Sequence, residues 1–198
     1  VFQMKRIIFS QKPYLYESAF QSYFHRIGWL LFLMVSATIT GVIINHFESA
    51  LSQMVILTSF IPMLMDTGGN SGSQSSVTVI RALALEQISF KDFFRVVCKE
   101  FWTAFLCGLT LSFVCFCKIF FVDRFILGND KVTVYVAVTV SLSLFITIII
   151  SKITGAVLPL IATKLKFDPA VMASPLITTI SDALSLIVYF SISKWLLF

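Results

Sequence analysis

Long runs without a charged side chain alternate with short polar segments along the chain. Asp, Glu, Lys and Arg are absent from residues 27–47, 51–65, 101–117 and 132–151. About 20 consecutive apolar residues are enough for a helix to cross the hydrocarbon core of a bilayer. The pattern therefore predicts an all-α integral membrane protein.

We expect five transmembrane helices per protomer. They cover approximately residues 27–47, 50–85, 100–122, 131–160 and 174–197. Residues 1–25 are polar and basic, and we expect them to form a cytoplasmic juxtamembrane or connecting helix. Residues 26–198 would then form the transmembrane domain.

The composition supports a membrane protein. Of the 198 residues, 58% are hydrophobic and 13% are charged, whereas about 25% are charged in an average soluble domain. The net charge of +5 comes from Lys and Arg that flank the apolar runs instead of forming one patch, so we expect no nucleic-acid partner. The expected surroundings are a lipid bilayer.

The distribution of basic residues indicates the orientation. Cytoplasmic connections are enriched in Lys and Arg. With the N-terminus in the cytoplasm and five spans, the outer side holds only Lys118, Arg124, Lys131 and Lys194. We therefore expect a multi-pass protein of the cell membrane with a cytoplasmic N-terminus and a C-terminus outside.

Two acids, Asp66 and Asp182, lie deep in apolar context. At 1.5 Å per residue, Asp182 is roughly 12 Å along the last span from Ser174, and Asp66 is roughly 24 Å from the outer start of the second span. Both carboxylates could thus lie at similar depths in the inner half of the membrane. Pairing with Lys118 or Lys152 is disfavoured, because both lie near the ends of predicted spans.

Ionisable groups inside a membrane usually face a cavity, a partner or an ion. An ion pathway is therefore our interpretation of both acids. The alternative for Asp182 is a protonated carboxyl, or one bonded to neighbouring hydroxyl groups. Those hydroxyls belong to Thr178, Thr179 and Ser181.

Residues 62–74 read Pro-Met-Leu-Met-Asp-Thr-Gly-Gly-Asn-Ser-Gly-Ser-Gln. Irregular backbone at membrane depth is tolerated only where it is buried or lines a cavity. Gly68 and Gly72 also have the spacing of a close helix contact, but packing alone does not call for Asn70 and Gln74. A phosphate-binding loop is excluded, because no Gly-Lys-Ser/Thr follows.

The donor groups in this region are oxygens, which suit a hard cation such as Mg²⁺ or Ca²⁺. Mg²⁺ is expected as a transported ion, and no organic cofactor is expected. The sequence contains no HExxH motif and no catalytic-triad pattern. We therefore do not expect an enzyme.

Residues 62–74, followed by Val-Ile-Arg-Ala-Leu-Ala at 79–84, resemble the Pro…Gly-Gly-Asn-x-Gly-x-Gln signature of the MgtE magnesium channel/transporter family. A second match is Asp-Pro-Ala-Val-Met-Ala-Ser-Pro at 168–175, followed by Thr-Thr-Ile-Ser-Asp at 178–182. A weaker third match covers residues 29–41.

The resemblance implies an MgtE-type transmembrane domain of five helices that works as a homodimer. Its pore lies between the protomers and is lined by the second and fifth helices. Asp182 would be the main site for hydrated Mg²⁺, and we expect Asp66 to contribute as a second metal-binding residue. The expected pore-lining residues are Gly68, Gly69, Asn70, Gly72, Gln74, Thr178 and Ser181.

The expected function is a divalent-cation channel or transporter for Mg²⁺. A Na⁺- or H⁺-coupled exchanger and a non-conducting assembly or sensor subunit are the alternatives. Typical bacterial family members carry cytosolic Mg²⁺-sensing domains before the membrane domain, whereas only residues 1–25 precede the first predicted span here. Feedback closure by intracellular Mg²⁺ is therefore not part of what the resemblance implies.

Overall fold

A computed structural model describes residues 16, 18–165 and 169–197, and these residues form helices joined by short turns. Most residues of the predicted segment 1–25, and Asp168 of the second motif, lie outside the described residues. The helices are α1 (Ala19–Ser36), α2 (Thr38–His46), α3 (Glu48–Gln53), η2 (Val55–Phe60), α4 (Ile61–Ala84), η3 (Phe90–Asp92), α5 (Phe93–Cys117), the π-helix η4 (Lys118–Ile126), α6 (Val134–Lys164) and α7 (Pro169–Leu197).

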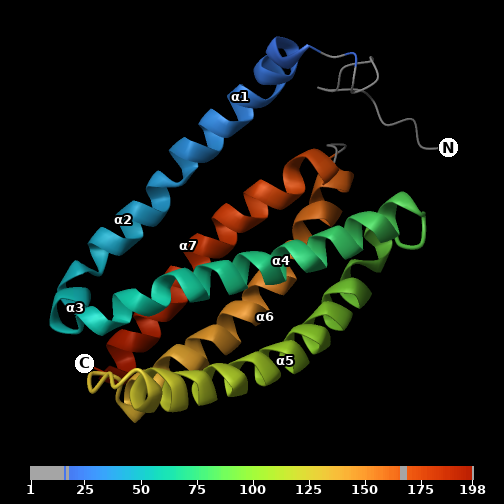
Figure 1. Ribbon diagram of the computed structural model, residues 1–198. Helices are drawn as coiled ribbons and strands as arrows, with labels where there is room; N and C mark the ends of the chain where they lie inside the picture. The colour runs from blue at the N-terminus through green and yellow to red at the C-terminus, as the bar shows by residue number, and fades with distance from the viewer. Residues whose placement is uncertain (1–15, 17, 166–168, 198) are drawn as a thin grey trace.

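Helix α6 is at the centre of the fold, with α4, α5 and α7 packed around it. Helix α4 also packs along α7. Helices α1 and α2 form a nearly continuous rod that diverges from this bundle, as Figure 1 shows, and touches it mainly through α7. The start of α1 and the end of α7 lie at opposite ends of the molecule (Figure 1).

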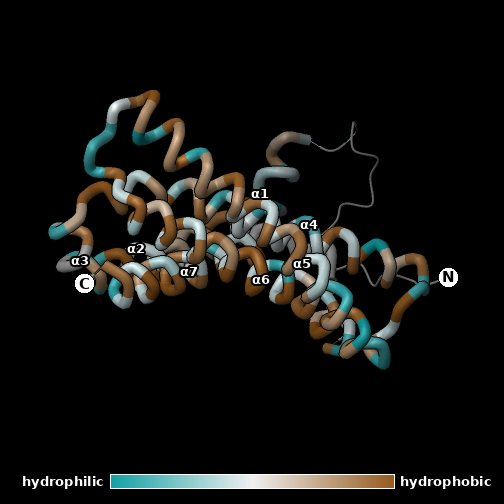
Figure 2. The backbone as a smooth tube through the Cα atoms, turned by 90° about the horizontal axis from the view of Figure 1, so that it is seen from below, coloured by the Kyte–Doolittle hydropathy of each residue, from teal (hydrophilic) through white to brown (hydrophobic). Residues whose placement is uncertain are grey.

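Among the described residues, four helical segments are long and apolar enough to cross a membrane: residues 19–46, 90–126, 134–164 and 176–197. Large apolar side chains cover their outer surfaces, including Trp102, Leu106 and Phe113, which are 59%, 63% and 69% exposed. Hydrophilic residues gather mainly towards the two ends of the bundle (Figure 2). The prediction of an all-helical membrane protein is therefore confirmed.

The predicted second span, residues 50–85, is not one continuous helix. The backbone at Met54 is not helical, with φ −133° and ψ 76°, and it separates α3 from η2 and α4. Helix α4 begins at Ile61, and Pro62 occupies its first turn, where a residue without an N–H group costs nothing. Helix α4 carries too many polar residues to be among the four apolar segments.

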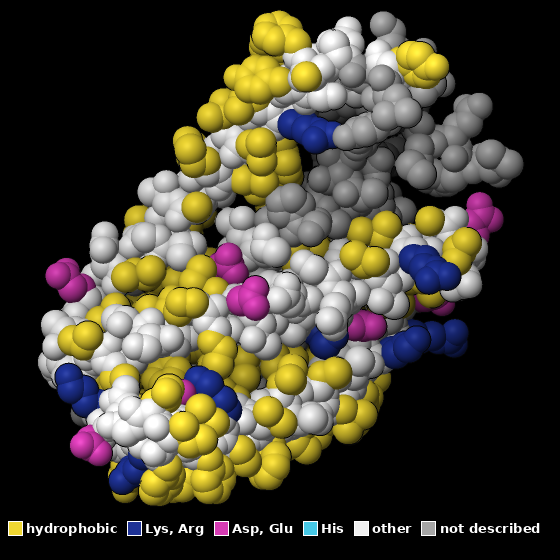
Figure 3. Space-filling view, viewed as in Figure 1, with side chains coloured by type: hydrophobic (Ala, Val, Ile, Leu, Met, Phe, Trp, Pro, Cys, Tyr) yellow, Lys and Arg dark blue, Asp and Glu magenta, His cyan; other side chains and the backbone are white. Residues whose placement is uncertain are grey.

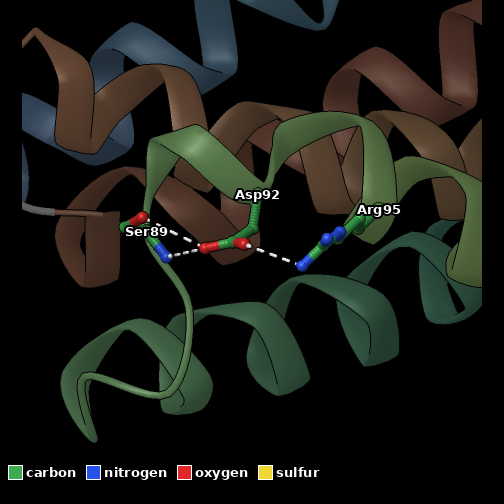
Figure 4. A network of polar contacts seen from close by, with 3 residues as sticks. All are labelled: Ser89, Asp92 and Arg95. Carbon is green, nitrogen blue, oxygen red and sulfur yellow. Dashed lines mark hydrogen bonds and ion pairs between the residues drawn. The ribbon is translucent and has the colours of Figure 1, made fainter.

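Helix α5 begins seven residues before the predicted start at Glu100. The helical path already begins at η3, which precedes α5 directly and starts with a capping box, shown in Figure 4: Asp92 Oδ2 accepts hydrogen bonds from the backbone N–H of Ser89 at 3.0 Å and from its hydroxyl at 3.1 Å. Such a box satisfies backbone donors that a helix start otherwise leaves free. Helix α6 has a comparable cap, because Val136 N–H donates to Thr133 Oγ1 at 3.2 Å.

Candidate functional site

Three glycines allow α4 to lie directly on α6 and α7. A Cβ atom placed on Gly68 would lie 2.6 Å from Ser185 Oγ of α7, and one on Gly72 would lie 3.0 Å from the carbonyl oxygen of Ser151 of α6. A Cβ atom on Gly155 of α6 would overlap the carbonyl group of Gly72. The absence of side chains thus permits backbone contact between helices, as in other membrane bundles.

Asp182 lies near the middle of α7, half-buried beside α4. A Cβ atom on Gly69 would lie 3.7 Å from Asp182 Oδ1 and 3.4 Å from the methyl carbon of Thr178. Asp66, on the exposed side of α4, is close enough to Asp182 for an electrostatic interaction between the two carboxylates. Figure 3 shows acidic side chains in the middle of this face, where α4 and α7 run side by side.

Asp66 is part of a polar stripe along α4. Asp66, Asn70 and Gln74 are spaced four residues apart and all three are exposed. Residues with this spacing lie on the same face of a helix. The stripe therefore presents a carboxylate and two amides on the side of α4 that α6 and α7 leave uncovered.

The predicted pore-lining residues fall into three groups. Asn70 and Gln74 are exposed on the stripe, and Gly69 and Thr178 lie next to Asp182. The remaining three are buried where α4 meets α6 and α7, in the close helix contact that was the alternative interpretation of the glycine spacing. These three are Gly68, Gly72 and Ser181.

Hydroxyl groups gather at the same helix contact. Thr147, Ser151 and Ser181 are each at most 1% exposed, and their hydroxyl oxygens have no hydrogen-bond partner among the described residues. Within the described part of the chain, no group of three or more His, Cys, Asp or Glu residues could hold a metal ion. A cation at this site would therefore be held by one or two carboxylates with hydroxyl, amide, carbonyl and water oxygens, the set that Mg²⁺ accepts.

The sequence reasoning missed the burial of charged side chains, among them Lys152 and Glu100. Lys152, which was placed near the end of a predicted span, lies inside α6 and is 5% exposed; Glu100, placed at the start of one, is 7% exposed within α5. The position of these residues next to a charge-free run could not reveal their burial, because the burial depends on how α5 and α6 pack together.

The chain is similar to known magnesium transporters. Residues 61–192 match the MgtE family, described as divalent cation transporter. The magnesium transporter MgtE of Bacillus subtilis is 39% identical over 96% of this chain, and that of Thermus thermophilus is 35% identical over 87%. The MgtE of Enterococcus faecalis is 28% identical over 85%.

The aligned part covers 39% of the Bacillus protein and 36% of the other two, so the chain spans less than half the length of these curated relatives. The family match includes α4 and most of α7, and thus both Asp66 and Asp182. Membership of this family also accounts for the signature at residues 62–74 and for the apolar helices. The chain belongs to the MgtE family of divalent cation transporters.

Proposed function

We propose that this chain conducts Mg²⁺ across the membrane, down its electrochemical gradient, through a homodimer pore lined by α4 and α7. The observation that carries the proposal is Asp182, a carboxylate in the middle of an apolar helix that faces the glycine-rich side of α4. Asp66 lies near enough to add a second negative charge. The relatives are named magnesium transporters, and transport, not catalysis, is the activity that we propose.

Electrostatics favours Asp182 as the main ion site. A hydrated Mg²⁺ ion about 4.5 Å from one carboxylate gains roughly 7 kcal/mol at an effective dielectric constant of 20. In a twofold dimer both copies of Asp182 would face the same axis and double the charge offered to the ion. Mg²⁺ dehydrates reluctantly, so the ion would keep most of its waters and be held through them.

The polar stripe of α4 supports the dimer. Asp66, Asn70 and Gln74 are uncovered in the single chain, and polar side chains facing lipid are costly. A second copy that packs against this side would replace lipid with a water-filled path. Gly69, Thr178 and Asp182 would line the α7 side of that path.

We also propose α4 as the fifth transmembrane helix. With its 24 residues it is about 36 Å long, which exceeds the ~30 Å hydrocarbon core, and it packs lengthwise on α6 and α7. Five spans would place the two termini on opposite sides of the membrane, and the distribution of basic residues favours a cytoplasmic N-terminus. Residues 26–198 would then form the conducting domain, and residues 1–25 a juxtamembrane segment.

Mg²⁺ uptake into liposomes tests the proposal. The purified chain is reconstituted without any Na⁺ or pH gradient, and uptake is followed with an internal Mg²⁺ indicator. We expect flux from the wild type and at least about a 100-fold loss in Asp182→Ala, since less than half of the estimated carboxylate attraction accounts for that factor.

The outcomes separate the possible mechanisms. Wild-type flux that appears only with an imposed Na⁺ or H⁺ gradient would indicate a coupled exchanger instead of a channel. Absence of flux under both conditions would favour an assembly or sensor subunit. Normal flux through a well-expressed Asp182→Ala protein would remove Asp182 from the path.

A further inference from the structure

Three charged side chains are buried among the described residues, and one of them, Asp123, is paired with Lys118 at 2.8 Å, which leaves two to be explained. Glu100 of α5 is 7% exposed, and Lys152 of α6 is 5% exposed. Ionisable groups within membrane helices are rare, and they usually pair with one another or with backbone carbonyls. Each of these two charges therefore requires a compensating group.

The packing of α5 on α6 brings the two residues to the same level. A Cβ atom on Gly108 of α5 would lie 3.0 Å from the ring of Phe145 of α6, which fixes the register of the two helices. The helices run in opposite directions (Figure 1). Glu100 is eight residues before Gly108, and Lys152 is seven residues after Phe145, so both lie about 11 Å from this contact on the same side.

Glu100 is also bonded to α4. Ser75 Oγ donates a hydrogen bond to Glu100 Oε2 at 2.6 Å. An ionised carboxylate can accept about four hydrogen bonds, so this single hydroxyl leaves most of its capacity unused. The nearest basic residues on α5 point elsewhere, because Lys99 is exposed and Arg95 lies 4.0 Å from Asp92 (Figure 4).

We infer that Glu100 and Lys152 act as a buried charge pair that holds α5 and α6 against α4 and thereby positions the α4 side of the ion path. In this conformation the ion pairs within 4.0 Å among the described residues are Arg95–Asp92 and Lys118–Asp123, so the Lys152 ammonium group is farther than that from Glu100. Its flexible four-carbon stem lets the ammonium group reach a carboxylate at the same level. Figure 3 shows basic and acidic side chains in the crease between α4 and α5.

A charge pair differs from two independent residues in a measurable way. Removal of one partner leaves an uncompensated buried charge and is strongly destabilising, whereas neutral replacement of both partners at similar volume is often tolerated. The pair is a positioning device, and its effect on flux rests on the proposed function. Its effect on stability does not.

The experiment is a double-mutant cycle of Glu100→Gln, Lys152→Met and the combined variant. Gln keeps the length of Glu and still accepts from Ser75, and Met keeps the unbranched shape of Lys. We expect each single change to lower the melting temperature in detergent by about 5 °C or more and to lower Mg²⁺ flux about tenfold. The combined variant should recover to within about threefold of wild-type flux, a coupling within the range of residues in one network.

Ser75→Ala is the matched control, because it removes one hydrogen bond and no charge; its flux should fall by about threefold or less. If the fold-loss of flux in the combined variant equals the product of the two single fold-losses, the residues act independently and the proposed charge pair is wrong. If neither single variant can be purified, recovery of folded combined variant supports the pair, and its absence overturns it. If the wild type conducts no Mg²⁺, the melting temperatures still complete the cycle.

A second readout separates positioning from general stability. The stripe of α4 carries Asp66 opposite Asp182, so displacement of α4 should raise the Mg²⁺ concentration that gives half-maximal flux. We expect this increase in both single variants and its reversal in the combined variant. A lower maximal flux at an unchanged half-saturating concentration would contradict the positioning role.

Discussion

Helices α1–α2 expose large apolar side chains, whereas helix α4 buries small residues. Gly28 of α1 and Gly41 of α2 have nothing within 4 Å of where a Cβ would be, and large apolar side chains such as Met34 are exposed around them. Helix α4 instead buries mostly small residues. These are Gly68, Gly69, Ser71, Gly72, Ser75 and Ser76, together with Leu64 and Val79. Lipid accepts large apolar side chains, so small and polar residues mark the places where membrane helices meet.

The largest effect on this contrast is expected from Gly155→Ala. The added methyl group would overlap the backbone of Gly72, and neither backbone can move without separating α4 from α6. Overpacking of a tight contact usually costs 1–3 kcal/mol, and here we expect the upper end, about 3 kcal/mol, measured by thermal unfolding in detergent.

The matched control is Gly41→Ala, which has open space around it. Alanine is favoured over glycine inside a helix by about 0.5–1 kcal/mol, so this variant should equal or exceed wild-type stability. Equal stability of the two alanine variants would show that α4 and α6 are not in backbone contact.

A smaller effect, on flux and not on folding, is expected from Asn70→Ala. The amide lies on the exposed stripe between Asp66 and Gln74, where it can bond to a water carried by the ion. Loss of one such hydrogen bond, about 1.4 kcal/mol, corresponds to roughly tenfold lower Mg²⁺ flux. The control is Asn45→Ala, the same change at an exposed position of α2, which should leave flux unchanged. An equal loss of flux in both variants would show that the polar stripe does not line the ion path.

The smallest effect concerns the contact of α7 with η2. Tyr189 is fully buried, and its hydroxyl donates a hydrogen bond to the carbonyl oxygen of Leu57 at 2.9 Å. Tyr189→Phe should cost about 1 kcal/mol and lower the melting temperature by about 3 °C. Tyr135→Phe, at a side chain that is 73% exposed, should change nothing; a shift as large as that of Tyr189→Phe would mean that the bond contributes no stability.

The sequence predicted the apolar helices well, because absence of charge over a long run is a local property. It also predicted similar depths for Asp66 and Asp182, since helical rise converts residue number into depth, but helical rise does not say whether the two helices face each other. The break at Met54 was not predicted. It is a change of backbone direction within an apolar run, and the run remains apolar on both sides of it.

Glu100 and Lys152 show where sequence reasoning stops. Glu100 directly precedes the charge-free run 101–117 and Lys152 directly follows the run 132–151, and their charges were therefore assigned to the ends of spans. Their burial depends on the register of α5 against α6, which Gly108 and Phe145 establish. No pattern within either segment contains this information.

The most direct measurement is Mg²⁺ flux into liposomes for Asp182→Asn beside Asp130→Asn. Both variants replace a carboxylate with an amide of the same shape, one in the middle of α7 and the other at an exposed turn between η4 and α6. We predict at least about a 100-fold loss for Asp182→Asn, from the estimated attraction between ion and carboxylate, and wild-type flux for Asp130→Asn. Equal flux in the two variants, at equal amounts of inserted protein, would contradict the account.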